Sequence, residues 1–249
     1  MRRTTALLAI LFIATISMHS NAQNKIEINK DIFLYHIQDS IFVHVTYENS
    51  EEWGRFSSNG LIYIKNGDAI MIDTPMDNEK TEVIHQYLTN NFKVNLSKLI
   101  IGHFHDDCLG GLEYIQGQGI ESIAGKLTID KCKEFDLPIP STSFIDSLII
   151  DFHGERVVCR YSGGGHTIDN ITVWFPNQQV LFGGCLIRTT QTQNLGNLAD
   201  AVDDQWASTV KKVVSQSPNV QVVIPGHGSW GGKELLFHTI SLAEKHLTD

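Results

Sequence analysis

Residues 103–111 read His-Phe-His-Asp-Asp-Cys-Leu-Gly-Gly, and they directly follow Lys98–Ile101, a mostly apolar segment that predicts a β-strand. On extended backbone, His103 and His105 point their imidazole rings the same way, and Asp107 continues that alternation with a carboxylate. Imidazole is a common zinc ligand, and paired rings at this spacing can share one ion. The stretch therefore predicts a metal site at the carboxyl end of a strand.

The sequence upstream of this stretch predicts a hairpin and a helix. Segments 61–64 and 69–72 are apolar and flank Asn66-Gly67, a dipeptide that favours the tight turn of a β-hairpin. A helix is expected over 78–91, because apolar side chains recur there on one side. The order is therefore hairpin, helix and strand, with histidines directly after the last strand.

The downstream half of the chain repeats this order. Segments 171–175 and 180–182 predict a second hairpin, 203–215 predicts a helix, and 220–224 predicts a strand. Strands that are apolar along their whole length fit sheets covered on both faces. We expect two sheets packed together, with helices outside and a ligand site where the strand ends meet.

Three further side chains have the type and position of metal ligands. Each stands on a glycine-bearing loop after an apolar segment, and they are His166, Cys185 and His227. The six candidates divide into two sets, His103, His105, His166 and Asp107, Cys185, His227. Thiolate together with imidazole favours zinc over magnesium or calcium, and three protein ligands per ion leave positions for water and substrate. The remaining histidines are interpreted as ordinary surface or core residues: His36, His44, His85, His153, His238 and His246.

Two of these interpretations have a structural alternative. The chain has four cysteines, and in an exported protein Cys185 can instead belong to a disulfide. We favour the metal thiolate, because Cys185 stands at a strand end where the site needs a ligand. Asp73 also stands at a strand end, where it can support the site or cap its own turn.

The first 22 residues have the layout of a secretory signal peptide. Arg2 and Arg3 precede the uncharged apolar run Ala6–Ser17, and small residues follow at Ser20 and Ala22. The run is too short to span a bilayer as a helix, although a retained membrane anchor is the alternative. We expect a mature domain over 23–249 in the periplasm, without membrane association once the signal is removed.

Composition excludes several other classes. The formal net charge of −9 argues against a nucleic-acid-binding protein, because phosphate neutralisation needs a basic face. A chain with 42% hydrophobic and 19% charged residues is not of the disordered class. Nothing in the sequence marks an oligomer interface, so a monomer is expected.

Residues 103–111, taken with Gly165-His166, Gly183-Gly184-Cys185 and Pro225-Gly226-His227-Gly228, resemble the metallo-β-lactamase superfamily. Within it, the chain looks like the broad-spectrum di-zinc enzymes that use three histidines at one metal and Asp, Cys and His at the other. The resemblance extends from the loop at Trp53 to His227. Glyoxalase-type relatives usually carry His where this chain has Cys108, and a bridging Asp where it has Cys185.

The resemblance implies an α/β fold, the four-layer αββα sandwich, with two Zn²⁺ ions at the edge between the sheets. It also implies hydrolysis of the β-lactam amide in penicillins, cephalosporins and carbapenems, and hence antibiotic resistance. A zinc-bound hydroxide would attack the amide with no covalent enzyme intermediate, and Asp107 would orient it. The alternatives are a hydrolase of a thioester, lactone or phosphodiester on the same fold, or a periplasmic zinc-binding protein without activity.

The resemblance also implies substrate-binding residues. Arg188 stands where relatives usually place a lysine that holds the drug carboxylate, and it adds a bidentate fork. Asn197 matches a carbonyl-polarising asparagine, with a turn residue as the alternative. Residues 51–58 lie in a polar loop expected over 48–59 and match a mobile loop that closes over substrate. Its apolar contacts would be Trp53 and Phe56, although Trp53 can instead pack on the body of the protein.

Overall fold

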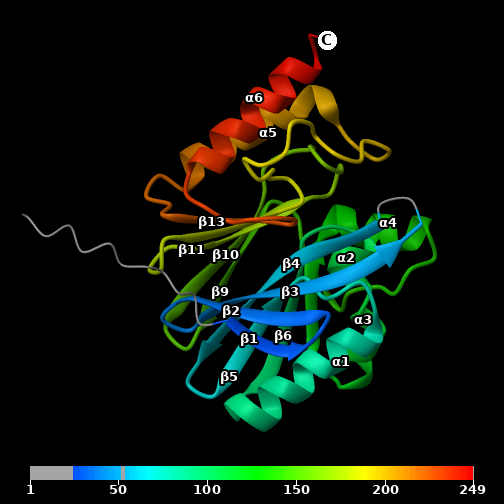
Figure 1. The fold of residues 1–249 in the computed structure, drawn as a ribbon, viewed down its shortest axis with the longest axis vertical. Helices are drawn as coiled ribbons and strands as arrows, with labels where there is room; N and C mark the ends of the chain where they lie inside the picture. The colour runs from blue at the N-terminus through cyan, green and yellow to red at the C-terminus, as the bar shows by residue number, and fades with distance from the viewer. Residues whose placement is uncertain (1–24, 52–53, 249) are drawn as a thin grey trace, which may run out of the picture.

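The computed structural model describes residues 25–51 and 54–248, which form two β-sheets that face each other, with helices on both outer sides (Figure 1). The predicted signal peptide 1–22 and Trp53 lie outside these residues. The larger sheet has its strands in chain order: β1 (Lys25–Asn29), β2 (Ile32–Gln38), β3 (Ile41–Ser50), β4 (Gly54–Lys65), β5 (Asp68–Ile72), β6 (Asn95–Ile101), β7 (Glu121–Gly125) and β8 (Thr142–Phe144).

The smaller sheet has the order β13-β12-β11-β10-β9. Its strands are β9 (Ser147–Phe152), β10 (Glu155–Tyr161), β11 (Ile171–Phe175), β12 (Val180–Gly184) and β13 (Val222–Pro225). The helices are α1 (Asn78–Tyr87), the π-helical turn η1 (Leu88–Phe92), α2 (Asp106–Leu109), α3 (Leu112–Gly117), α4 (Lys126–Glu134), α5 (Asp203–Gln216) and α6 (Glu234–His246). Among the described residues, no helix combines the length and the apolar character needed to cross a membrane.

Three clusters of buried apolar side chains fill the spaces between neighbouring layers, and this layering confirms the αββα sandwich. The central cluster lies between the sheets, where Ile72 of β5 faces residues such as Phe182 of β12. A second cluster joins the larger sheet to α1, α3 and α4, and it includes Met71, the neighbour of Ile72. A third joins the smaller sheet to α5 and α6 around the fully buried Trp206. Neighbouring residues of one strand thus enter different apolar layers, which explains the continuous apolar runs.

Both halves have the predicted order of elements. β4 and β5 form an antiparallel hairpin, and positive φ angles of 49° at Asn66 and 86° at Gly67 make its tight turn. β5 then pairs in parallel with β6, and α1 connects them, with η1 as its final turn. In the second half, β11 and β12 pair antiparallel, and α5 leads to β13, which pairs in parallel with β12.

The prediction of a polar loop over 48–59 is wrong. β3 and β4 continue through this segment as a two-stranded ribbon, paired as far as Ser50 with Gly54. Backbone pairing satisfies the amide groups of such a ribbon without apolar side chains. Arg55 also holds the ribbon, because it donates to Asp31 Oδ1 at 2.8 Å and lies 4.4 Å from the centre of the Tyr47 ring.

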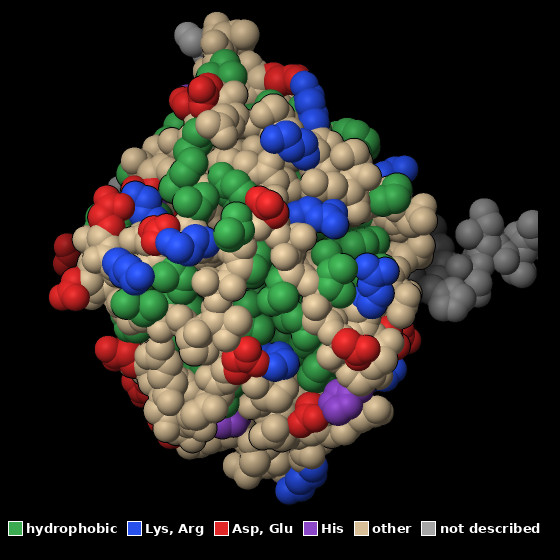
Figure 2. Space-filling model, turned by 180° about the vertical axis from the view of Figure 1, so that it is seen from behind, with side chains coloured by type: hydrophobic (Ala, Val, Ile, Leu, Met, Phe, Trp, Pro, Cys, Tyr) green, Lys and Arg blue, Asp and Glu red, His purple; other side chains and the backbone are tan. Residues whose placement is uncertain are grey.

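The acidic excess of the chain is not gathered into one field on the face shown in Figure 2. There, Lys and Arg side chains lie among Asp and Glu side chains. Several charged side chains of the protein form ion pairs, such as Lys211 with Glu244 and Lys131 with Glu134. The net charge of −9 therefore does not indicate that this face binds a ligand of opposite charge.

Candidate metal centre

The six predicted ligands converge at one edge of the sandwich, beyond the carboxyl ends of parallel strands. The loop after β6 carries His103 and His105, and Cys185 directly follows β12. His227 follows β13, and His166 lies in the connection between β10 and β11. The carboxyl ends of the parallel strands thus lie at the same edge of the sandwich, where α/β folds usually bind their ligands.

Three histidines form the first set. His105 Nδ1 lies 3.0 Å from His103 Nε2 and 3.3 Å from His166 Nε2. His103 is 2% exposed and His166 is 8% exposed, so two of the three rings are buried. The three nitrogens face one another as the ligands of a single ion would.

The second set contains one oxygen, one sulfur and one nitrogen. Asp107 Oδ2 lies 3.2 Å from Cys185 Sγ and 3.1 Å from His227 Nε2, and Cys185 Sγ lies 3.4 Å from that nitrogen. The other carboxylate oxygen of Asp107 lies 3.8 Å from His103 Nε2. Asp107 therefore stands between the two sets.

The backbone conformation expected for residues 103–107 is wrong, although the side chains do meet. β6 ends at Ile101, the chain bends at His103, and Asp107 lies in the first turn of α2. His105 occupies the N-cap position of that helix. A bend followed by one helical turn brings the side chains together, whereas an extended alternation would have continued the strand.

These donor sets fit zinc. Bonds of about 2.0–2.3 Å around a tetrahedral ion place neighbouring donors roughly 3.3–3.8 Å apart. The donor separations within the two sets, 3.0–3.4 Å, are within a few tenths of an ångström of that range. Imidazole nitrogen, thiolate sulfur and carboxylate oxygen are also the ligand types that zinc takes. All four cysteines are free, which excludes the disulfide alternative for Cys185 in this structure.

Burial and mutual charge shift the pKa values of the cluster. Desolvation lowers the pKa of His166 well below its usual value and also lowers that of His103. Burial acts in the same direction on His227, but the charges of Cys185 and Asp107 outweigh it and raise that pKa well above its usual value. At Asp107, burial is outweighed by His227 and the other histidines, which lower the pKa of the carboxyl group. The negative charge of this second set is the charge that a divalent cation neutralises.

The second ring nitrogens of three histidines are held by partners that fix each ring. His105 Nε2 donates to Asp200 Oδ2 at 2.9 Å, and His227 Nδ1 donates to the backbone carbonyl of Ser57 at 2.7 Å. His103 Nδ1 lies 3.0 Å from Cys108 Sγ. Such partners select the tautomer in which the other nitrogen is free to bind metal. No motif marks Asp200, which lies 95 positions from His105 along the chain.

Asp73 supports the histidine loop. Its Oδ1 accepts a hydrogen bond of 2.6 Å from the backbone N–H of Gly102, the residue before His103. Asp73 is 1% exposed, and burial raises its pKa to about 7 despite that hydrogen bond. The sequence left two roles open for Asp73, support of the site and capping of its own turn, and these contacts agree with the first.

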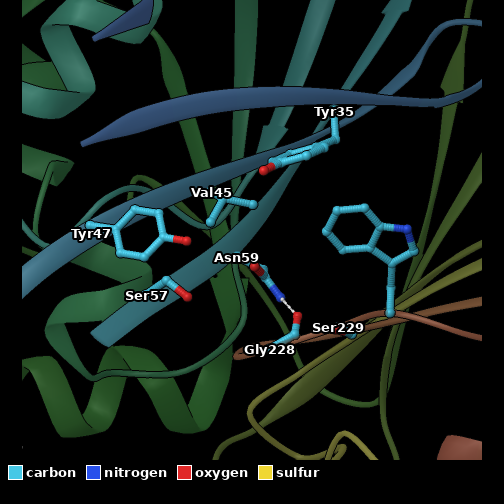
Figure 3. Close-up of a pocket in the computed structure, with 8 residues that line it drawn as sticks. Tyr35, Val45, Tyr47, Ser57, Asn59, Gly228 and Ser229 are labelled. Carbon is cyan, nitrogen blue, oxygen red and sulfur yellow. Dashed lines mark hydrogen bonds between the residues drawn. The ribbon is translucent and has the colours of Figure 1, made fainter. Parts of the chain in front are cut away.

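Asn59 holds the loop of His227 from behind. Its side-chain amide donates to the carbonyls of Pro225 at 2.9 Å and Gly228 at 2.8 Å, and its backbone N–H donates to Gly226 at 2.8 Å. Figure 3 shows Asn59 pointing toward Gly228 at the base of a second cavity of about 450 Å³. Sequence reasoning missed this residue, which is buried in β4 and 166 positions from Pro225.

Asn59→Ala is expected to weaken zinc binding by the Asp107, Cys185, His227 set by about tenfold, because residues that orient ligands typically matter on that scale. Competition with a chromophoric chelator measures the zinc affinity of each donor set in the wild type and in the variant. Asn95→Ala is the matched control, since the Asn95 amide donates to exposed Asp68 far along the same sheet. Equal zinc affinities in all three proteins would show that Asn59 does not position His227.

Four of the six donors line a cavity of about 920 Å³, and they are His105, Asp107, His166 and His227. The structure brings Phe56, Arg188 and Asn197 to the same cavity. Phe56 belongs to the β3–β4 ribbon, and its ring centre lies 6.4 Å from that of His227. The proposed contact of Trp53 lies outside the described residues.

Arg188 and Asn197 differ in how they line this cavity. The Arg188 side chain lies against the backbone of Gly196, where a Cβ would be 2.9 Å from one terminal nitrogen. Burial lowers the pKa of Arg188, and its Nε has no hydrogen-bond partner among the described residues. Asn197 is exposed, and its Oδ1 accepts a hydrogen bond from the backbone N–H of Ala199 at 3.0 Å. This contact agrees with the alternative role of a turn residue, while the position of Asn197 on the cavity agrees with contact to substrate.

Comparison with known proteins gives one consistent result. The family described as Metallo-beta-lactamase superfamily matches residues 53–227. "Metallo-beta-lactamase type 2" of Bacteroides fragilis is 37% identical over 247 residues, 99% of this chain and 98% of that protein. The structure of a metallo-beta-lactamase from Pontibacter korlensis has a TM-score of 0.82 at 34% identity, over 86% of this chain and 99% of that one. The structure of TMB-1 has a TM-score of 0.84 at 35% identity, over 88% and 100%.

Proposed function

The chain belongs to the metallo-β-lactamase superfamily, and from this premise we propose that it is a zinc-dependent hydrolase of the β-lactam amide bond. The observation that carries the proposal is a single cavity whose wall presents donors of both sets, His105 and His166 of the first and Asp107 and His227 of the second. Relatives named as metallo-beta-lactamases over nearly their whole length support the same substrate class. A cavity of about 920 Å³ also has the size that holds a drug-sized molecule.

Zinc held by these residues supplies a Lewis acid and allows hydrolysis at neutral pH without a strong general base. His103, His105 and His166 would hold one ion, and Asp107, Cys185 and His227 would hold a second. Asp107 Oδ1 lies 3.8 Å from His103 Nε2, so it can orient a water that attacks beside the three-histidine set. It can take the proton of that water and return it to the lactam nitrogen as the C–N bond breaks. Since water itself attacks, no side chain forms a covalent intermediate with the substrate.

Three finer points belong to the proposal. Two zinc ions are proposed because His103 and His166 both lie within 3.3 Å of His105 Nδ1, and because Asp107, Cys185 and His227 form a second group of three neighbouring donor atoms. Carbapenems are proposed among the substrates, with antibiotic resistance as the consequence, on the resemblance to broad-spectrum di-zinc enzymes. Export to the periplasm is also proposed, and the signal-peptide layout of residues 1–22 supports it. A monomeric state stays an expectation.

The test is hydrolysis of a chromogenic cephalosporin, a penicillin and a carbapenem by zinc-loaded protein, with and without a chelator. We expect turnover of all three, loss of turnover with the chelator, and two zinc ions per chain by elemental analysis. Turnover of a thioester, lactone or phosphodiester alone would assign the protein to another reaction of the same fold. Zinc binding without any turnover would make it a binding protein.

Arg188→Ala is expected to raise KM about tenfold for substrates with a carboxylate and to change kcat little, because an anchoring contact holds substrate and transition state alike. Arg188→Lys is the matched control: it keeps the charge but loses the bidentate fork, so it should raise KM less than Arg188→Ala does. Steady-state kinetics with a β-lactam acid and its methyl ester measure the effect, which the ester should not show. An unchanged KM for the acid would place the carboxylate anchor elsewhere.

A further inference from the structure

Two stacked phenylalanine rings form an apolar wall of the cavity beside His105. The ring centres of Phe104 and Phe135 lie 5.3 Å apart with their planes at 5°. Phe104 also lies 4.4 Å, centre to centre, from the ring of His105. Phe104 comes from the loop after β6 and Phe135 from the end of α4, and both line the cavity of the metal donors.

Phe135 is exposed where most large apolar side chains are buried. It exposes 48% of its surface, whereas Phe104 beneath it exposes 7%. The ammonium group of Lys131 lies 5.3 Å from the centre of the Phe135 ring and is paired with Glu134, so the ring has a fixed neighbour on α4. An ordered aromatic ring that faces a cavity offers apolar contact area to a ligand at little entropic cost.

The wall and Arg188 lie beside opposite metal donor sets. Phe104 is adjacent to His105 of the three-histidine set, whereas Arg188 follows Cys185 of the second set by three positions, and both line the same cavity. A penicillin or a cephalosporin carries its substituents in a matching order. Its carboxylate is attached next to the lactam nitrogen, and its acylamino substituent is attached next to the lactam carbonyl, at the other end of the molecule.

These two arrangements fit in one orientation. With the carboxylate at Arg188 and the amide bond between the two donor sets, the acylamino group extends toward Phe104 and Phe135. We propose that the Phe104–Phe135 wall binds the apolar acyl side chain of the substrate, and that Phe135 makes the protein selective for β-lactams with an aryl-bearing acyl group. This inference rests on the proposed function and assigns a substrate subclass to that site.

The test compares benzylpenicillin, which has a phenylacetyl group, with 6-aminopenicillanic acid, which is the same nucleus without an acyl group. Phe135→Ala is expected to lower the ratio of kcat/KM for benzylpenicillin to that for 6-aminopenicillanic acid about fivefold to tenfold, the scale of one aromatic contact. Phe135→Tyr keeps the ring and is expected to retain the ratio. Phe237→Ala is the matched surface control, because Phe237 on α6 is 53% exposed and is absent from the cavity lining.

The outcomes separate the inference from the function on which it rests. An unchanged ratio in Phe135→Ala, or an equal fall with both substrates, overturns the inference while hydrolysis of β-lactams stands. Failure of the zinc-loaded wild-type protein to hydrolyse any β-lactam overturns the proposed function and the inference with it. A change in the ratio with Phe237→Ala would attribute the selectivity to stability and also overturn the inference.

Discussion

Cys185→Ser is expected to leave one bound zinc ion where the wild type binds two, and to lower kcat/KM for a cephalosporin at least about a hundredfold. The thiol lies 3.2 Å from Asp107 Oδ2 and 3.4 Å from His227 Nε2, so it completes the second donor set. A serine hydroxyl does not ionise near neutral pH and is a poor zinc ligand. Residues that only orient ligands already matter 10- to 100-fold, so loss of a ligand itself should reach or exceed that scale.

The measurement is zinc per chain after dialysis, together with kinetics in zinc-free and zinc-supplemented buffer. The three-histidine set is untouched by the substitution, so one ion should remain. Cys159→Ala is the matched control, because Cys159 is an equally buried free thiol in the core between the sheets. It should keep two ions. Two ions and wild-type kinetics in Cys185→Ser would refute the assignment of this ligand.

Gly226→Ala is expected to lower both stability and zinc affinity. A Cβ at Gly226 would lie 2.3 Å from Cys185 Sγ and 2.7 Å from the Cys185 backbone nitrogen. The backbone atom cannot rotate away, so either the loop before His227 or the thiol must shift. Overpacking of this kind typically costs about 1–3 kcal/mol, which corresponds to a fall in Tm of about 2–10 °C in a domain of this size.

Gly117→Ala provides the contrast for this substitution. Gly117 ends α3, and a Cβ there would meet no atom within 4 Å. Its Tm should be unchanged or slightly higher, because alanine is the better helix former. Thermal unfolding with zinc bound and after chelation measures both variants. If Gly226→Ala matches Gly117→Ala in Tm and in zinc content, the close approach to Cys185 is not required.

The sequence predicted the elements and the metal donors because their signals are local. Asn66-Gly67 makes its own turn, and a ligand after a strand is carried to the sheet edge by the fold itself. The polar segment 48–59 misled the prediction: it includes the end of β3 and the start of β4, and backbone groups satisfy antiparallel pairing whatever the side chains are. The alternation expected through Asp107 failed because α2 begins at Asp106.

The residues that sequence reasoning missed act across long separations. Asn59 reaches Pro225 over 166 positions, and Asp200 reaches His105 over 95. Phe135 stacks on Phe104 from the far end of α4. None of these residues stands in a motif, since an asparagine in a strand or a phenylalanine after a helix is ordinary. Their roles depend on which elements the folded chain brings together.

Both donor sets take ligands from both halves of the chain. The first joins His105 to His166, 61 positions apart, and the second joins Asp107 to Cys185, 78 positions apart. Each bound zinc ion would thus close a long loop of the chain as a disulfide does, and the four cysteines form no such bridge. Unlike a disulfide, this cross-link depends on supply: each tenfold fall in free zinc removes about 1.4 kcal/mol per ion while the ion's site is saturated. Resistance of the folded chain to proteolysis should therefore follow the zinc concentration around it.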